Sequence, residues 1–176
     1  AAILLVLLLA VPVQVHAQAN NCGMGLNPCA LIQSVEDIAM GTWSGTGNFN
    51  SSWMNHCVRI SGSAASPAYE YRITFSIDEV AAGGRLRLPS TSGYSDELRI
   101  RVRYNDNVSS GNVNFNDNGV EEATNFQGLT RTEQNDCVAT GTGAQKLKII
   151  ITQNWINNLD HSGDYGGTLR ILITPQ

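Results

Sequence analysis

Cysteines are the residues of this 176-residue chain whose chemistry follows most directly from their number and spacing: Cys22, Cys29, Cys57 and Cys137. An even number of cysteines in an exported chain is typical of disulfide bonds, and four cysteines allow three pairings. A zinc site is disfavoured because no CxxC pair exists and, beyond the N-terminal apolar segment, the only histidines are His56 and His161. We therefore predict disulfide bonds and no metal.

Catalytic constellations are incomplete in this sequence. Ser44 lacks the preceding glycine of a nucleophile elbow because Thr42 takes that place, and neither HExxH nor a phosphate-binding loop with its lysine occurs. His56 is expected to alternate outward from a strand, as a surface histidine, and His161 is expected in a loop. No carboxylate pair stands out for glycoside cleavage. We predict that the chain is not an enzyme and needs no cofactor.

The segment NFNDNG, Asn114 to Gly119, has the spacing of the start of a calcium loop. Its ligand positions are mostly amides, and the twelfth position is Asn125, where a calcium loop needs a bidentate carboxylate. Asn118-Gly119 is a good tight-turn pair, so a turn is the better interpretation.

Arginines alternate with apolar residues between Leu98 and Tyr104, so that Arg99, Arg101 and Arg103 share one face of an expected strand. The favoured interpretation is a solvated sheet face on which these arginines pair with acidic residues such as Glu70 or Glu97. The alternative is a cationic face for an anionic glycan or partner, together with Arg85 and Arg87 of a neighbouring strand.

The N-terminal segment is expected to be a signal peptide. An apolar run from Ala1 to Val13 is too short for a comfortable membrane span, and Val15-His16-Ala17 fits the small-residue rule for cleavage. No Met or basic region precedes the run, so we expect the first residues of the leader to be missing. We predict a signal peptide over 1–17, a short segment over 18–28, and a single domain over 29–176, with the leader outside the fold.

Charge argues against two classes of partner. The net charge of −4 disfavours nucleic acid, and the scarcity of lysine and the scatter of arginine disfavour a membrane surface.

Short alternating segments separated by turn residues predict an all-β fold, an antiparallel sandwich of seven or eight strands. The first strand is expected to run from Cys29 through Ile32, Val35 and Ile38. The clearest alternation covers 69–77, 98–104, 147–151 and 169–173, and the segment 154–160 is expected to make one helical turn.

Several short motifs occur in a characteristic order: Cys29 in a first strand, IAMGTWSG (Ile38 to Gly45), Cys57 in the next strand, LRIRVRYND, Cys137 followed by KLKIIIT, and the closing SGDYGGTLRILITP. In this order and in its ending, the chain resembles the spore coat protein U-like family, the subunits of archaic chaperone–usher pili of Gram-negative bacteria. The resemblance covers essentially all of the chain after the leader.

The resemblance implies an immunoglobulin-like sandwich that lacks its final strand. A periplasmic chaperone first fills the groove beside the last strand, and the N-terminal extension of a neighbouring subunit fills it later. By analogy, Tyr165 would form a tyrosine corner and Cys29–Cys57 and Cys22–Cys137 would be the disulfides. The groove would be lined by Ile32, Leu169, Ile171 and Ile173.

One departure from the family concerns the donor segment. The stretch over 18–28 offers only Met24 and Leu26 as apolar donor residues, which makes it a poor strand. The chain is therefore expected to be a surface pilus subunit that accepts a strand more readily than it donates one, as at a tip. Its expected partners are the chaperone, an usher and neighbouring subunits. The alternative is a self-contained secreted sandwich that binds a host or surface glycan or another anionic ligand.

Overall fold

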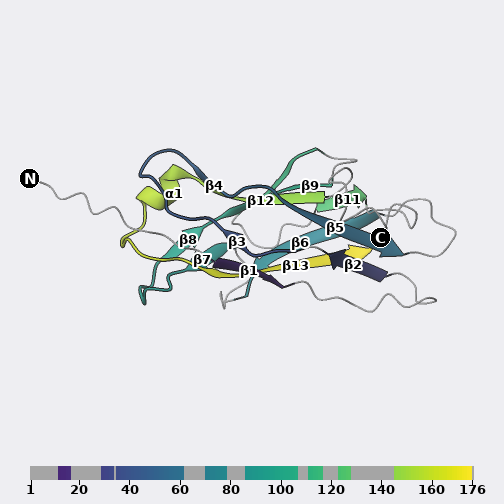
Figure 1. Cartoon of the computed structure of the whole chain (residues 1–176), viewed down its shortest axis with the longest axis horizontal. Helices are drawn as coiled ribbons and strands as arrows, with labels where there is room; N and C mark the ends of the chain where they lie inside the picture. The colour runs from purple at the N-terminus through teal and green to yellow at the C-terminus, as the bar shows by residue number, and fades with distance from the viewer. Residues whose placement is uncertain are drawn as a thin grey trace, which may run out of the picture.

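The computed structural model describes residues 12–16, 29–33, 35–61, 70–78, 86–106, 111–116, 123–127 and 145–175. These residues form thirteen strands and one short helix (Figure 1). The elements are β1 (Pro12–His16), β2 (Cys29–Gln33), β3 (Ile38–Ala39), β4 (Phe49–Asn50), β5 (Met54–Ser61), β6 (Glu70–Ile77), β7 (Arg87–Pro89), β8 (Glu97–Arg99), β9 (Arg101–Asn105), β10 (Val113–Phe115), β11 (Ala123–Gln127), β12 (Gln145–Ile151), α1 (Gln153–Asn157) and β13 (Gly167–Pro175).

Two large sheets make up the sandwich. One has the strand order β11-β6-β13-β1-β3, and the other has the order β10-β9-β12-β5-β2, with β4 also paired to β12. Strands β7 and β8 form a small separate hairpin. The prediction of an all-β sandwich is confirmed.

Apolar side chains at every second position fill the space between the sheets. β6 alternates strictly between half-buried and buried residues, as expected from its period-two sequence. The predicted inward sets on β9 and β12 are also buried, as are Leu169 and Ile171 of β13, and they meet β6 in one core cluster. Ile173 is half-buried against this cluster. Its largest side chains include Tyr71, Phe75, Tyr104, Phe115 and Phe126. The expected helical turn is present as α1.

The strand count differs from the expected seven or eight because long alternating stretches are divided. The expected first strand becomes β2 in one sheet and β3 in the other. Exposed Glu36 and Asp37 lie in the connection, where the chain passes between the sheets. Ile100 separates β8 from β9, and its backbone N–H donates to Leu86 O at 2.9 Å. Within the described residues, no helix has the length and apolar character needed to cross a membrane.

Candidate functional site

Strand β13 is the centre of the candidate site because a strand from the far N-terminus lies beside it. β1 pairs with β13 in parallel, from Val13 opposite Gly167 to His16 opposite Arg170. On its other side β1 pairs antiparallel with β3, through Pro12 and Val13. Figure 1 shows β1, in purple, beside β13, in yellow. We call the position that β1 occupies between β13 and β3 the strand slot.

The occupied slot involves residues of the predicted leader, and the signal peptide over 1–17 stays a prediction. Residues 12–16 were expected to lie outside the fold as part of a leader, but they form a strand of the sheet. Cleavage after Ala17 stays a prediction. The sequence did contain a signal for this strand, since Val13 and Val15 alternate with Gln14 and His16. That alternation follows directly on an apolar run, whose composition is also that of a leader.

The predicted groove residues divide between the two sheets. Leu169 is fully buried, Ile171 is 6% exposed and Ile173 is half-buried, so one face of β13 points into the core. Ile32 is buried too, but it lies on β2, which pairs with β5 in the other sheet. The described strand across the slot from β13 is β3, whose buried residue is Ile38.

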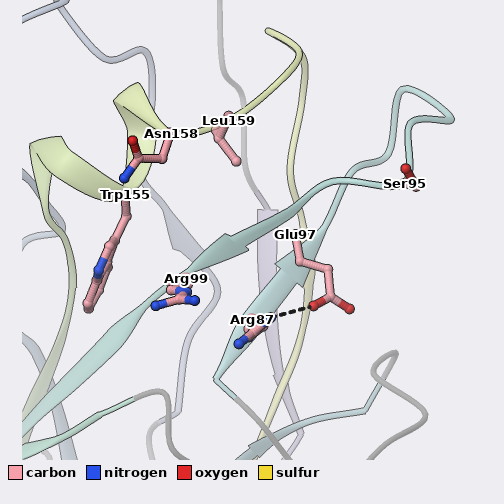
Figure 2. Close-up of a pocket in the computed structure, with 7 residues that line it drawn as sticks. All are labelled: Arg87, Ser95, Glu97, Arg99, Trp155, Asn158 and Leu159. Carbon is pink, nitrogen blue, oxygen red and sulfur yellow. Dashed lines mark hydrogen bonds and ion pairs between the residues drawn. The ribbon is translucent and has the colours of Figure 1, made fainter.

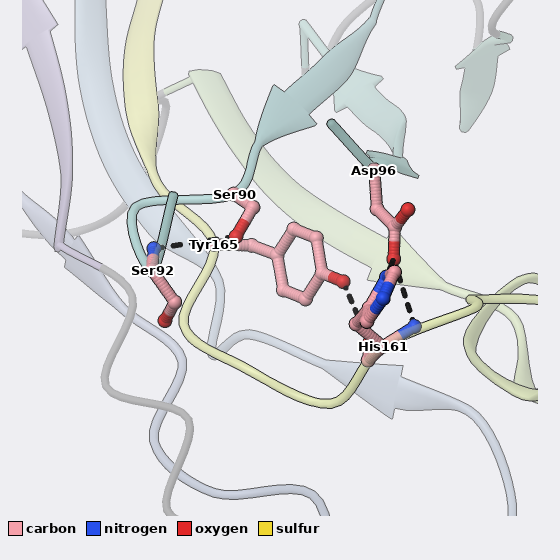
Figure 3. A network of polar contacts seen from close by, with 5 residues as sticks. All are labelled: Ser90, Ser92, Asp96, His161 and Tyr165. Atoms are coloured by element: carbon pink, nitrogen blue, oxygen red, sulfur yellow. Dashed lines mark hydrogen bonds and ion pairs between the residues drawn. The ribbon is translucent and has the colours of Figure 1, made fainter. Parts of the chain in front are cut away.

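The segment entering β13 is fixed by polar contacts (Figure 3). The Tyr165 hydroxyl donates to the backbone oxygen of His161 at 3.0 Å, which is the hydrogen bond of a tyrosine corner. The backbone N–H of His161 donates to Asp96 Oδ2 at 2.8 Å, and His161 Nδ1 lies 3.0 Å from the same oxygen. The His161 ring also stacks on Tyr94. His161 therefore lies in a loop, as predicted, and helps to hold the start of β13.

Strand register is incompatible with the disulfide Cys29–Cys57 that the resemblance implies. Cys29 lies opposite Ser61 and Cys57 lies opposite Gln33. Four residues along a strand separate the two cysteines by about 13 Å, whereas a disulfide needs α-carbons within about 7 Å. Cys57 is disulfide-bonded. Cys22 and Cys137 lie outside the described residues, so the pairing of Cys57 stays a prediction.

The side chain of His56 is buried, with 1% exposure, and the prediction of a surface histidine is wrong. Met54, His56 and Val58 face the core, and Cys57 on the opposite face is covered as well. Burial lowers the pKa of His56 to about 4, because a charged imidazole would lose its hydration there. His56 Nε2 lies 3.4 Å from the Tyr104 hydroxyl, which in turn bonds the Tyr71 hydroxyl. Burial also raises the pKa of both tyrosines, so this cluster is neutral at ordinary pH.

The arginine stripe lies on the outer face of the second sheet. Arg101 Nε donates to Asn116 at 2.6 Å and Arg103 Nε donates to Asn114 at 2.8 Å. Neither arginine pairs with a carboxylate among the described residues, and Glu97 instead forms an ion pair with Arg87 at 3.2 Å. Asn114 thus lies in β10 and accepts a hydrogen bond from Arg103 of the stripe. Residues 117–119 of the expected turn lie outside the described residues.

A pocket of about 380 Å³ lies at one end of this stripe (Figure 2). Strands β7 and β8, Ser95 before β8, Trp155 of α1 and the two residues that follow the helix supply its walls. Arg99 lies between the Trp155 ring and the ion pair of Arg87 and Glu97. Trp155, Asn158 and Leu159 carry no sequence signal for this pocket, because nothing in their spacing points to β8. The complete lining is Arg87, Ser95, Glu97, Arg99, Trp155, Asn158 and Leu159.

Metal-binding clusters of His, Cys, Asp or Glu are not found within the described part of the chain. The one close histidine–carboxylate pair described above, His161 with Asp96, is solvent-exposed on the histidine side and serves to position a loop. A carboxylate on Nδ1 would also suit a catalytic histidine, but among the described residues no serine or cysteine side chain forms a hydrogen bond with the His161 ring.

Comparison with known proteins gives a similarity at the level of structure. No family model matches the sequence, and neither does any curated protein. A chain from a solved structure described as a chaperone–tip adhesin complex in CFA/I fimbriae biogenesis is similar, at 14% sequence identity and a TM-score of 0.49. The match covers 84% of this chain and 41% of the other, so this chain spans less than half the length of that one.

Proposed function

We propose that this chain is a structural subunit of a bacterial surface pilus, exported through the periplasm, which accepts a β-strand from another protein. The observation that carries the proposal is the position of β1 in the strand slot. β1 inserts between two strands that lie far from it in the sequence. β3 follows it by about 25 residues and β13 by about 150 residues. The slot therefore accommodates a strand that is not contiguous with either neighbour.

Cleavage of the predicted leader after Ala17 removes β1. β13 is then left with β6 as its partner, and β3 loses the strand with which it pairs. The opened edge exposes backbone N–H and C=O groups beside Leu169, Ile171 and Ile38, which are buried while β1 is present. Such an edge binds an extended chain through backbone hydrogen bonds and selects it through alternate side chains.

The expected occupants are strands from other proteins of the same assembly. A periplasmic chaperone fills the slot after export, and a neighbouring subunit replaces it at the usher. The segment over 18–28 contains Cys22, four asparagine or glutamine residues and only two large apolar residues, Met24 and Leu26, which makes it a poor donor. The chain is therefore an acceptor, as a tip or terminal subunit would be, and it acts through assembly rather than catalysis.

The experiment compares residues 1–176 with residues 18–176 by thermal melting, with and without a synthetic peptide of residues 11–17. Loss of four register pairs removes about four hydrogen bonds worth about 1 kcal/mol each. The melting temperature should fall by about 10 °C. The peptide should restore most of this loss.

The matched control is the same peptide with Val15→Pro, which cannot complete the backbone ladder and should not restore stability. If residues 18–176 melted at the temperature of the longer chain and ignored both peptides, the slot would not be a strand acceptor.

A further inference from the structure

Positive charge is concentrated on the outer surface of the second sheet and its adjoining hairpin. We call this surface the basic face; it comprises Arg87, Arg99, Arg101, Arg103, Lys146 and Lys148. It contains both lysines of a chain with only 11 Lys and Arg residues and a net charge of −4. Inward-facing Val102, Tyr104 and Leu147 are fully buried, so the alternating basic side chains on β9 and β12 must point away from the core.

Like charges lie directly opposite each other at two places on the basic face. Lys148 is the cross-strand partner of Arg103, and Arg87 is the cross-strand partner of Arg99. Such pairs destabilise a sheet unless an opposite charge lies nearby. Glu97 pairs with Arg87. Within the described residues, no carboxylate forms an ion pair with Arg103 or Lys148.

Two tryptophans bound the basic face. Lys146 and Lys148 lie over the Trp53 ring, with Nζ 5.2 and 5.0 Å from its centroid. At the other end the Arg101 guanidinium lies 5.7 Å from the Trp155 ring, and Trp155 also lines the pocket. Guanidinium groups bind carboxylates and sulfates through paired hydrogen bonds, and an indole ring offers an apolar surface to the C–H face of a sugar.

We propose that the basic face binds a linear acidic polysaccharide and that the pocket holds one of its sugar units. A volume of about 380 Å³ is within the range of small-ligand pockets. In its lining, Arg99 would bind an acid group of the sugar and Trp155 would pack against the face of its ring. Asn158 and Glu97 would form hydrogen bonds with its hydroxyl groups. The carboxylate of Glu97, whose charge is balanced by Arg87, can accept hydrogen bonds from sugar hydroxyls. Successive arginines on β9 recur about every 7 Å, an arrangement that suits a polymer with regularly repeated acid groups.

The test uses calorimetry on the complete chain with three probes: a galacturonic acid hexamer, a heparin hexasaccharide and a neutral galactose hexamer. Binding of either acidic probe, with no binding of the neutral one, supports the proposal, and the tighter acidic probe identifies the preferred acid group. Raising NaCl from 0.05 to 0.5 M should weaken acidic binding roughly tenfold by screening. This measurement does not depend on any variant folding.

A pair of single-charge variants locates the site. Arg103→Gln should weaken acidic binding about threefold, as expected for one exposed charge contact. Arg170→Gln removes the same charge from β13 in the other sheet and should change binding less than twofold. Equal effects of the two variants, no binding of either acidic probe, or tighter binding of a hexameric single-stranded DNA would overturn the proposal.

Discussion

Strand β13 has a different kind of neighbour on each side. On one side β6 runs antiparallel through seven register pairs, from Leu169–Ile77 to Pro175–Tyr71. On the other side β1 runs parallel through four pairs, from Gly167 to Arg170. Parallel pairing is slightly less stable per residue, and the β1 side is also the shorter of the two.

The two sides also differ in what supports each neighbour. β6 buries Tyr71, Ile73, Phe75 and Ile77 in the centre of the core. β1 lies within the segment 1–17 that is predicted to be cleaved, and its other partner, β3, contributes only two register pairs. We infer that β6 is a permanent part of the domain, whereas β1 occupies a position that another strand can take.

The largest expected effect comes from a substitution on β6, the permanent neighbour of β13. Phe75 is buried opposite Ile171 and packs edge-on against Phe115, with ring centroids 4.8 Å apart. Phe75→Ala should cost about 4 kcal/mol through lost burial and a cavity. The free energy of unfolding, measured by chemical denaturation, should fall equally in residues 1–176 and in residues 18–176 with the slot peptide. A loss below 1 kcal/mol would contradict the assignment of β6 as the more stable side.

Acid should weaken the core on which β6 packs, because His56 of β5 is buried there and is linked through Tyr104 to Tyr71 of β6. His56 titrates near pH 6.5 when unfolded but has a pKa of about 4 in the fold. Between these values the unfolded chain binds a proton that the folded chain does not, so stability falls as pH falls below about 6.5. The loss attributable to His56 should reach about 2 kcal/mol at pH 5.

A matched variant separates this effect from carboxylate titration. His56→Gln keeps a polar group near the Tyr104 hydroxyl but cannot take up the proton. Its free energy of unfolding should change little between pH 6.5 and 5, in chains with and without β1. Equal pH dependence in the variant and the original chain would show that His56 is not the titrating group.

Local alternation made the core strands predictable from the sequence, because the side chains of a half-buried strand alternate between core and solvent with a period of two residues. The inward residues of β6, β9 and β12 follow that rule. Alternation gave the wrong side for His56, because its neighbour Cys57 is also buried and β5 is therefore covered on both faces. β1 was missed because an apolar leader and an apolar strand share a composition. The pocket depends on the spatial approach of α1 to β8, which no local pattern encodes.

The smallest expected effect tests how the entrance to β13 supports the strand slot. Tyr165→Phe removes the hydroxyl that donates to His161 O but leaves the backbone bridge between Tyr165 and Ser90. The global loss should be about 1 kcal/mol, the value of one hydrogen bond. Because β1 pairs from Gly167 onward, two residues past the tyrosine, affinity of residues 18–176 for the slot peptide should fall about threefold, as measured by fluorescence anisotropy. The matched control Tyr94→Phe removes an exposed hydroxyl but keeps the ring that stacks on His161, and it should leave peptide affinity within twofold. If Tyr165→Phe did the same, the corner would stabilise the fold without shaping the slot.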